Sequence, residues 1–194
     1  MRLLINNIKD TKGVTLIELL VVVSIVGILV IALGFSYEGW IGNYRLESAT
    51  KDMYADLMEA KTRALTRTRA HFITITATQY IIYEDTNTAP DGNGTLETAS
   101  DTVVLQKTIA NKYELKMVSA GAFPQTIIMD TRGMITPVIT FRIDPGHPAC
   151  CPTKTCGATD ALRCRYPDYD CILVSQIRIQ TGKYNGTTTT CDPK

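Results

Sequence analysis

The chain has 194 residues, of which 45% are hydrophobic, and its 20 basic and 19 acidic side chains leave a net charge of +1. This length suits one membrane-spanning helix and one modest globular domain, and it argues against a second domain. The near-neutral balance neither favours nor excludes nucleic acid, so local charge has to be examined.

The chain opens with a short, net-positive leader that is followed by an apolar run. No charge occurs from Leu19 to Tyr37, and these 19 residues, at about 1.5 Å each, nearly cross a hydrocarbon core of roughly 30 Å. No Ala-x-Ala type cleavage site follows the run, which argues against a secretory signal peptide. Arg2, Lys9 and Lys12 against the single acid Asp10 predict a cytoplasmic leader and an exported C-terminal part.

Glu18 is the unusual residue of this region. A carboxylate in an apolar segment costs about 2.5–3.5 kcal/mol unless it reaches the surface or finds a partner. Its position, one residue outside the uncharged run, fits a carboxylate at the headgroup level as well as it fits a functional acid.

The residues Lys12-Gly13-Val14-Thr15-Leu16-Ile17-Glu18 closely resemble the class III leader of type IV prepilins and pseudopilins. The resemblance implies that prepilin peptidase cleaves between Gly13 and Val14 and that the new N-terminal residue is methylated. It also implies that Glu18 pairs with the N-terminal amine of a neighbouring subunit, which compensates the buried acid. Val14 replaces the usual Phe or Met. Phe35 stands where major pilins commonly carry Pro, which favours a minor pilin or a pseudopilin.

The helix is predicted to continue beyond the apolar run. One apolar stripe recurs at steps of three or four residues, at Leu46, Ala49, Met53, Leu57, Ala60 and Ala64. From His71 the period becomes that of strands. The predicted strands are Phe72 to Thr76, Tyr80 to Tyr83, Thr102 to Lys107, Tyr113 to Val118, Thr126 to Met129, Met134 to Ile143 and Ile172 to Gln180. This order predicts an α+β fold with the helix on an antiparallel sheet, which is the pilin architecture.

The helix, the Tyr-Ile-Ile-Tyr-Glu-Asp stretch and the strand order are similar to the GspH/FimT class of pseudopilins and minor pilins. Some members of that class bind DNA through a C-terminal Gly-Arg-x-Arg motif, but here Gly182 is followed by Lys183, Tyr184 and Asn185. The missing guanidinium groups argue against DNA binding by this route. The basic cluster of Lys61, Arg63, Arg67 and Arg69 is interpreted as solvated cations near a helix C-terminus, with a DNA groove as the alternative.

All six cysteines lie in the C-terminal part of the predicted exported region: Cys150, Cys151, Cys156, Cys164, Cys171 and Cys191. Their even number, and the Pro- and Gly-rich stretch that holds most of them, predict disulfides that restrain a long loop. Zinc is the alternative, although paired Cys-x-x-Cys motifs are lacking. Connectivity cannot be deduced from the sequence.

Two other kinds of site receive little support. Asp85, Asn87, Asp91 and Asn93 alternate like calcium ligands, but Ala89-Pro90 interrupts the EF-hand order, so a solvated hairpin is the preferred interpretation. No catalytic motif accompanies His71 or His147, which predicts a protein that is not an enzyme and has no cofactor.

The sequence therefore predicts a leader at 1–13, a transmembrane or filament-core helix at 14–38, and an exported head domain at 39–194. The expected function is that of a structural subunit, a minor pilin or pseudopilin, which starts in the inner membrane and assembles with other pilin subunits into a type IV pilus or type II secretion filament. The alternative is a binding module at a filament tip, including one for DNA uptake.

Overall fold

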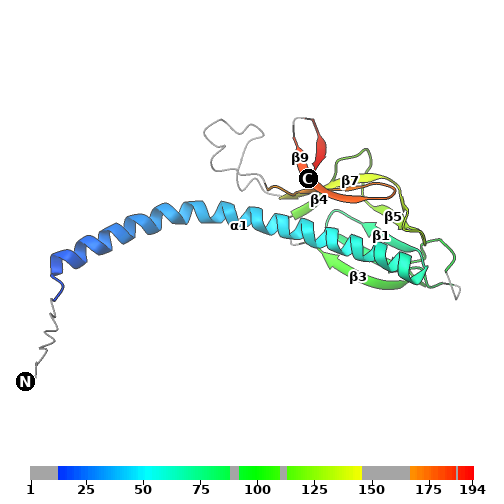
Figure 1. Ribbon diagram of the computed structural model, residues 1–194, viewed down its shortest axis with the longest axis horizontal. Helices are drawn as coiled ribbons and strands as arrows, with labels where there is room; N and C mark the ends of the chain where they lie inside the picture. The colour runs from blue at the N-terminus through cyan, green and yellow to red at the C-terminus, as the bar shows by residue number, and fades with distance from the viewer. Residues whose placement is uncertain (1–12, 88–91, 110–112, 146–166, 187) are drawn as a thin grey trace, which may run out of the picture. The chain divides into compact units, whose positions relative to one another are not determined.

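A computed structural model describes residues 13–87, 92–109, 113–145, 167–186 and 188–194, without the side chains of 31–42 and 145 (Figure 1). The chain divides into two compact units, Met1–Glu38 and Gly39–Lys194. The second unit is called the head below. One helix, α1 (Leu16–Arg67), contributes residues to both units.

The first unit contains the start of α1. All described side chains from 13 to 30 are exposed. A helix that is apolar around its whole circumference is stable in a membrane or against other helices rather than in water. This segment therefore needs an environment that the isolated chain does not supply.

The head combines the rest of α1 with two antiparallel sheets. The first sheet has the strand order β3-β2-β1-β5-β6, and the second has the order β10-β9-β8-β7-β4. The strands are β1 (His71–Ile75), β2 (Gln79–Glu84), β3 (Thr102–Thr108), β4 (Tyr113–Met117), β5 (Gln125–Met129), β6 (Ile135–Thr136), β7 (Ile139–Pro145), β8 (Cys171–Val174), β9 (Ile179–Asn185) and β10 (Thr190–Pro193).

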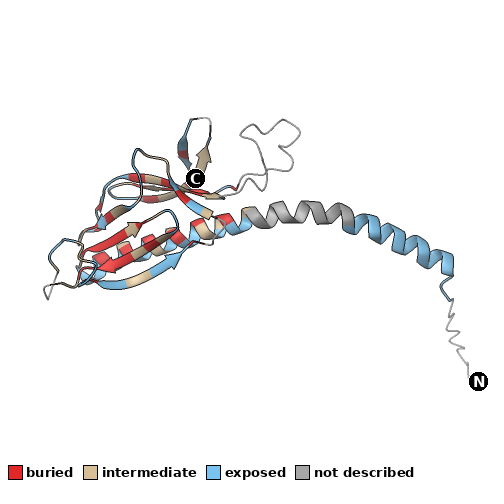
Figure 2. Ribbon diagram, turned by 180° about the vertical axis from the view of Figure 1, so that it is seen from behind, coloured by how far each residue is buried: buried red, intermediate tan, exposed pale blue. Residues whose placement is uncertain are grey.

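The apolar stripe of α1 forms one core with both sheets. Leu57 and Ala64 are fully buried, and they share a cluster with Ile73 of β1 and with Phe141 and Ile172 of β7 and β8. Figure 2 shows the buried positions of the strands and of this part of the helix. The predicted α+β fold, with a helix packed on antiparallel strands, is confirmed.

Two stretches that were each predicted as one strand form two strands each. Pro137 divides the stretch predicted from Met134 to Ile143 into β6 and β7, which belong to different sheets. Proline cannot donate to a strand ladder, which explains the break. The stretch predicted from Ile172 to Gln180 is a hairpin, because Ser175 to Arg178 turn between β8 and β9. Strand β10 was not predicted.

A disulfide joins Cys171 of β8 to Cys191 of β10, with 6.1 Å between the two Cα atoms. The two strands flank β9, so the bond bridges across it. Gly182 of β9 lies between them. A Cβ at this position would collide with the backbone oxygen of Asp192 and would lie 2.9 Å from Cys191 Sγ. The close approach of these strands therefore requires glycine.

We expect Gly182→Ala to lower the free energy of unfolding by about 1–3 kcal/mol, because the methyl group must push β10 away from β9. Equilibrium denaturation of the detergent-solubilised full chain, followed by far-UV circular dichroism, measures the change. Gly186→Ala is the matched control, since a Cβ there meets no atom within 4 Å. Equal stability of the two variants would contradict the close approach.

Candidate functional site: the N-terminal segment and the anchor of the helix

The first turn of α1 begins at Thr15. The Glu18 backbone N–H donates to the Thr15 hydroxyl oxygen over 3.3 Å, and the Leu19 N–H donates to the Thr15 carbonyl oxygen over 3.2 Å. Thr15 is thus the N-cap, and the Thr-x-x-Glu spacing is that of a capping box. The leader motif and the helix cap therefore share the same residues, and the cap was not predicted from the sequence.

The predicted cleavage and assembly residues lie around this cap. Gly13 and Val14 directly precede it and are exposed, and no atom lies within 4 Å of a Cβ built on Gly13. Glu18 is also exposed, in the first helical turn, where the helix dipole favours a negative charge. The peptide bond between Gly13 and Val14 is therefore open to approach in the isolated chain.

Within the part of the chain that the structure describes, no helix is long and apolar enough to cross a membrane.

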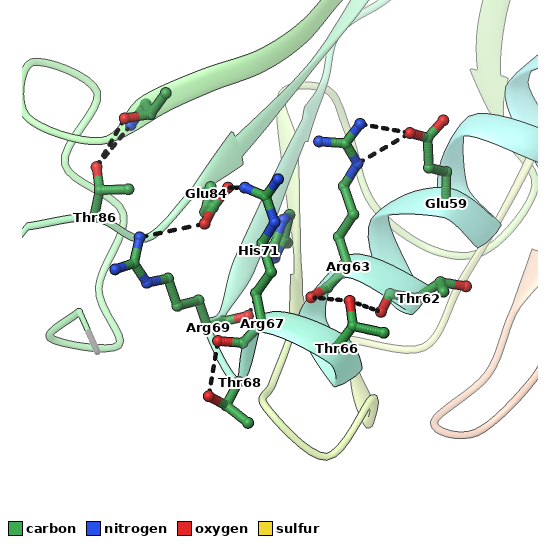
Figure 3. A network of polar contacts seen from close by, with 11 residues as sticks. Glu59, Thr62, Arg63, Thr66, Arg67, Thr68, Arg69, His71, Glu84 and Thr86 are labelled. Carbon is green, nitrogen blue, oxygen red and sulfur yellow. Dashed lines mark hydrogen bonds and ion pairs between the residues drawn. The ribbon is translucent and has the colours of Figure 1, made fainter. Parts of the chain in front are cut away.

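The C-terminal end of α1 is held to the first sheet by a buried carboxylate. The Glu84 side chain of β2 is 5% exposed, and its two oxygens accept from Arg67 at 2.7 Å and from Arg69 at 3.4 Å (Figure 3). A buried carboxylate without a partner is unfavourable, and the two half-exposed guanidinium groups compensate this one. The pairs therefore fix the end of the helix against β2.

The other two cations of the predicted basic cluster also have partners. Arg63 pairs with Glu59 one turn earlier, at 2.6 Å, and Lys61 donates to the carbonyl oxygen of Ile177 over 2.5 Å. These residues were interpreted as solvated cations; each has a partner in the structure, while the Arg67 side chain is still 53% exposed. They connect α1 to itself, to β2 and to the β8–β9 turn, so they do not form an open basic groove.

His71 lies beside this anchor and is fully buried. Its Nδ1 lies 3.1 Å from the Arg69 carbonyl oxygen, so Nδ1 carries the proton and donates. The Nε2 atom has no hydrogen-bond partner among the described residues. Burial lowers the pKa of His71, and this outweighs the opposing hydrogen bond to Arg69 and the nearby Glu84 carboxylate. The ring is therefore neutral at pH 7.

A second polar contact ties the middle of α1 to the first sheet. One carboxylate oxygen of Asp56 accepts from the Tyr80 hydroxyl over 2.5 Å and from Lys107 over 2.6 Å. Burial raises the pKa of Tyr80, and the hydrogen bond to Asp56 raises it further, so the phenol stays protonated and donates. Strands β2 and β3 are thus both linked to the helix.

The residues of the calcium hypothesis lie around a loop whose backbone amides bind the Asp85 carboxylate. The Asp85 carboxylate accepts from the backbone N–H groups of Asn93 and Gly94 at 3.1 and 2.7 Å, and Asp91 lies outside the described residues. Asn87 and Asn93 are described, but no group of three His, Cys, Asp or Glu side chains in the described ranges is placed to hold a metal ion. The Asp85 carboxylate thus contacts Asn93 through the backbone amide of Asn93.

Of the predicted disulfide cysteines, Cys171 and Cys191 are bonded to each other. Cys150, Cys151, Cys156 and Cys164 lie outside the described residues.

Comparison with known proteins identifies a prokaryotic N-terminal methylation motif at residues 8–34. This range contains Gly13, Val14 and Glu18, so the predicted prepilin-type leader is confirmed as a motif. No curated protein matches the chain.

Two solved structures are similar in fold. The type IV minor pilin FimU of Pseudomonas aeruginosa aligns with 19% identity and a TM-score of 0.47, over 74% of this chain and 92% of that one. The minor pseudopilin EpsH of the Vibrio cholerae type 2 secretion system aligns with 12% identity and a TM-score of 0.43, over 69% and 92%. Identities and TM-scores this low do not decide function.

Because burial lowers the pKa of His71 below its usual 6.5, the unfolded chain takes up this proton first as the pH falls. His71 therefore stabilises the fold fully above pH 6.5, and we expect stability to fall below that pH by up to about 1.4 kcal/mol per unit. Denaturant midpoints between pH 7 and pH 5 measure this slope.

His71→Asn should flatten the pH dependence, whatever its effect on absolute stability. His147→Gln, at the only other histidine, is the control and should keep the wild-type slope. A slope that His71→Asn leaves unchanged would show that another group causes the acid sensitivity.

Proposed function

We propose that the chain is a structural subunit of a type IV pilus or a type II secretion filament, namely a minor pilin or pseudopilin without enzymatic activity. The observation that carries the proposal is the N-terminal methylation motif at residues 8–34, which spans the predicted cleavage site and the start of α1. The exposed apolar side chains of residues 14–30 support it, because such a surface needs a membrane or neighbouring helices.

In this proposal, residues 1–13 are a leader that prepilin peptidase removes and Val14 becomes the methylated N-terminus. Residues 14–38 anchor the subunit in the inner membrane in a single pass and later form the filament core. Residues 39–194 are the exported head. The head is held on α1 by the buried stripe and by the contacts of Glu84 and Asp56.

Glu18 has a specific role in this scheme. Its carboxylate is exposed in the monomer, so it is available to pair with the N-terminal amine of a neighbouring subunit. The pair neutralises both charges when the apolar helices pack together. A DNA-binding tip module has less support, because Arg63, Arg67 and Arg69 already pair with carboxylates.

We expect Gly13→Ala to leave the leader attached, because the peptidase site accepts only a very small residue before the cleaved bond. Immunoblots of membranes from strains with and without the peptidase show the difference in mobility. Gly27→Ala is the control, since a Cβ at either glycine meets no atom within 4 Å. Equal mobility of the wild-type chain in both strains would refute the assignment.

We expect Glu18→Gln to be processed normally but incorporated into filaments about tenfold less, or worse, because the partner's amine is left without a counter-charge. Quantitative immunoblotting of sheared filaments against total membranes measures incorporation. Asp52→Asn removes an exposed carboxylate from the head and should have no such effect.

Thr15→Ala separates the effect of the Glu18 charge from the effect of the N-cap. The variant keeps the charge and weakens only the first helical turn, by about 1 kcal/mol. Normal incorporation of Glu18→Gln at wild-type expression would remove the carboxylate from the assembly mechanism.

A further inference from the structure

The head has a cleft between α1 and the second sheet. It has a volume of about 410 Å³ and is lined by Tyr54, Met58 and Lys61 of the helix, by residues Ile177 to Thr181, and by Lys194. The residues that line it include the three cations Lys61, Arg178 and Lys194 and no Asp or Glu. The volume lies in the range of sites that bind small molecules or peptide side chains.

The β8–β9 turn forms the rim of this cleft and is fixed by its backbone. The Ser175 hydroxyl donates to the Arg178 carbonyl oxygen over 2.7 Å. The Gln176 carbonyl oxygen accepts from the Ile135 N–H over 2.7 Å, and the Ile177 carbonyl oxygen accepts from Lys61. The turn is thus held from inside the hairpin, from β6 and from the helix.

This rigid turn presents an apolar side chain to solvent. Ile177 is 74% exposed, whereas turns usually carry Gly, Asn, Asp or Pro. A single exposed apolar residue is common, but this one is the tip of a fixed turn and lies beside Met58, which is also exposed. A preorganised apolar group of this kind loses little conformational entropy when a partner covers it.

Arg178 adds a charge that no described residue compensates. Lys194 pairs with Asp168 at 3.0 Å and Lys61 is bonded to a carbonyl group, but the Arg178 guanidinium has no hydrogen bond or ion pair among the described residues. Arginine beside an apolar anchor is a common composition for the energetic centre of a protein interface. A ligand complementary to this cleft therefore carries a carboxylate next to an apolar side chain.

We propose that this cleft binds an acidic, partly apolar segment of a different protein, which, if the proposed function holds, is a neighbouring filament subunit. Its carboxylate pairs with Arg178, and an adjacent apolar side chain packs on Ile177 and Met58. Nucleic acid fits less well, because phosphate binding relies on several uncompensated cations and Arg178 is one.

A second copy of the chain also fits less well. Three of the four acids of α1 within the head are already paired: Glu47 with Lys51, Asp56 with Lys107, and Glu59 with Arg63. The helix of another copy therefore offers few free carboxylates to this cleft.

The test places a photo-reactive amino acid at position 177 of the full chain in its native membrane. Position 103 is the matched control, because Val103 is 50% exposed on β3 of the other sheet. We expect a discrete adduct at 177 and none at 103. Mass spectrometry should map the adduct to a segment of a different protein in which Asp or Glu adjoins an apolar residue.

Charge variants of Arg178 make the test specific. Arg178→Glu should lower the adduct yield at 177 by about tenfold or more, whereas Arg178→Lys should lower it by less than about threefold. Both variants should keep the wild-type melting temperature and the Cys171–Cys191 bond, because the side chain is exposed. No adduct, a nuclease-sensitive adduct, a lipid adduct, a cross-link to another copy, or a yield that ignores Arg178→Glu would each overturn the proposal.

Leader processing and filament incorporation are measured in the same strains. If both fail while the charge-dependent adduct persists, the proposed function is wrong and the binding site stands. If both succeed while the adduct is absent, the site is wrong and the proposed function stands.

Discussion

The buried stripe of α1 is the constraint on which the head depends. Leu57 and Ala64 lie in one cluster with residues of both sheets, so the helix is the surface that closes the core. Burial of apolar area contributes about 25 cal/mol per Å², but it has no direction. The polar contacts supply the direction: Glu84 holds the end of the helix to β2, Asp56 holds its middle to β2 and β3, and Lys61 holds it to the β8–β9 turn. These contacts restrict rotation of the helix about its axis, and the buried stripe keeps it packed on the sheets.

The distribution of apolar side chains on α1 differs between its two ends. In the head it has one apolar stripe and exposed charges, which is the pattern of a helix on a globular core. From 16 to 30 it exposes large apolar side chains around its whole circumference. Thr15 caps this segment from within the predicted mature chain, so removal of residues 1–13 would leave the cap in place. The proposed processing and the stability of the first turn are therefore compatible.

The sequence was sufficient where one local pattern decides the structure. The period of Leu46 to Ala64 gave the buried face of α1, and the spacing from Gly13 to Glu18 gave the leader motif. It was insufficient where long-range partners decide. Nothing near Arg67 or Arg69 in the chain shows that Glu84 pairs with both. A run of β-branched residues also does not show that a chain reverses at Ser175 to Arg178, because that turn contains neither Gly nor Pro and depends on the Ser175 hydroxyl and on contacts from β6 and α1. Pro137 was a local signal of a break, and the sequence analysis overlooked it.

The net charge of +1 does not show that some charged side chains are paired within the chain and others are not. The cations near the end of α1 serve internal contacts: Arg63 pairs with Glu59 of the helix, and Arg67 and Arg69 share the single carboxylate of Glu84. Such pairs stabilise one arrangement of helix and sheet. Recognition by this chain therefore depends on charged groups that have no internal partner among the described residues. Glu18 in the first turn of α1 and Arg178 at the rim of the cleft are such groups, one of each sign, and each lies beside exposed apolar surface. Apolar contact gives affinity and the single charge gives selectivity, which suits the proposed assembly with other subunits.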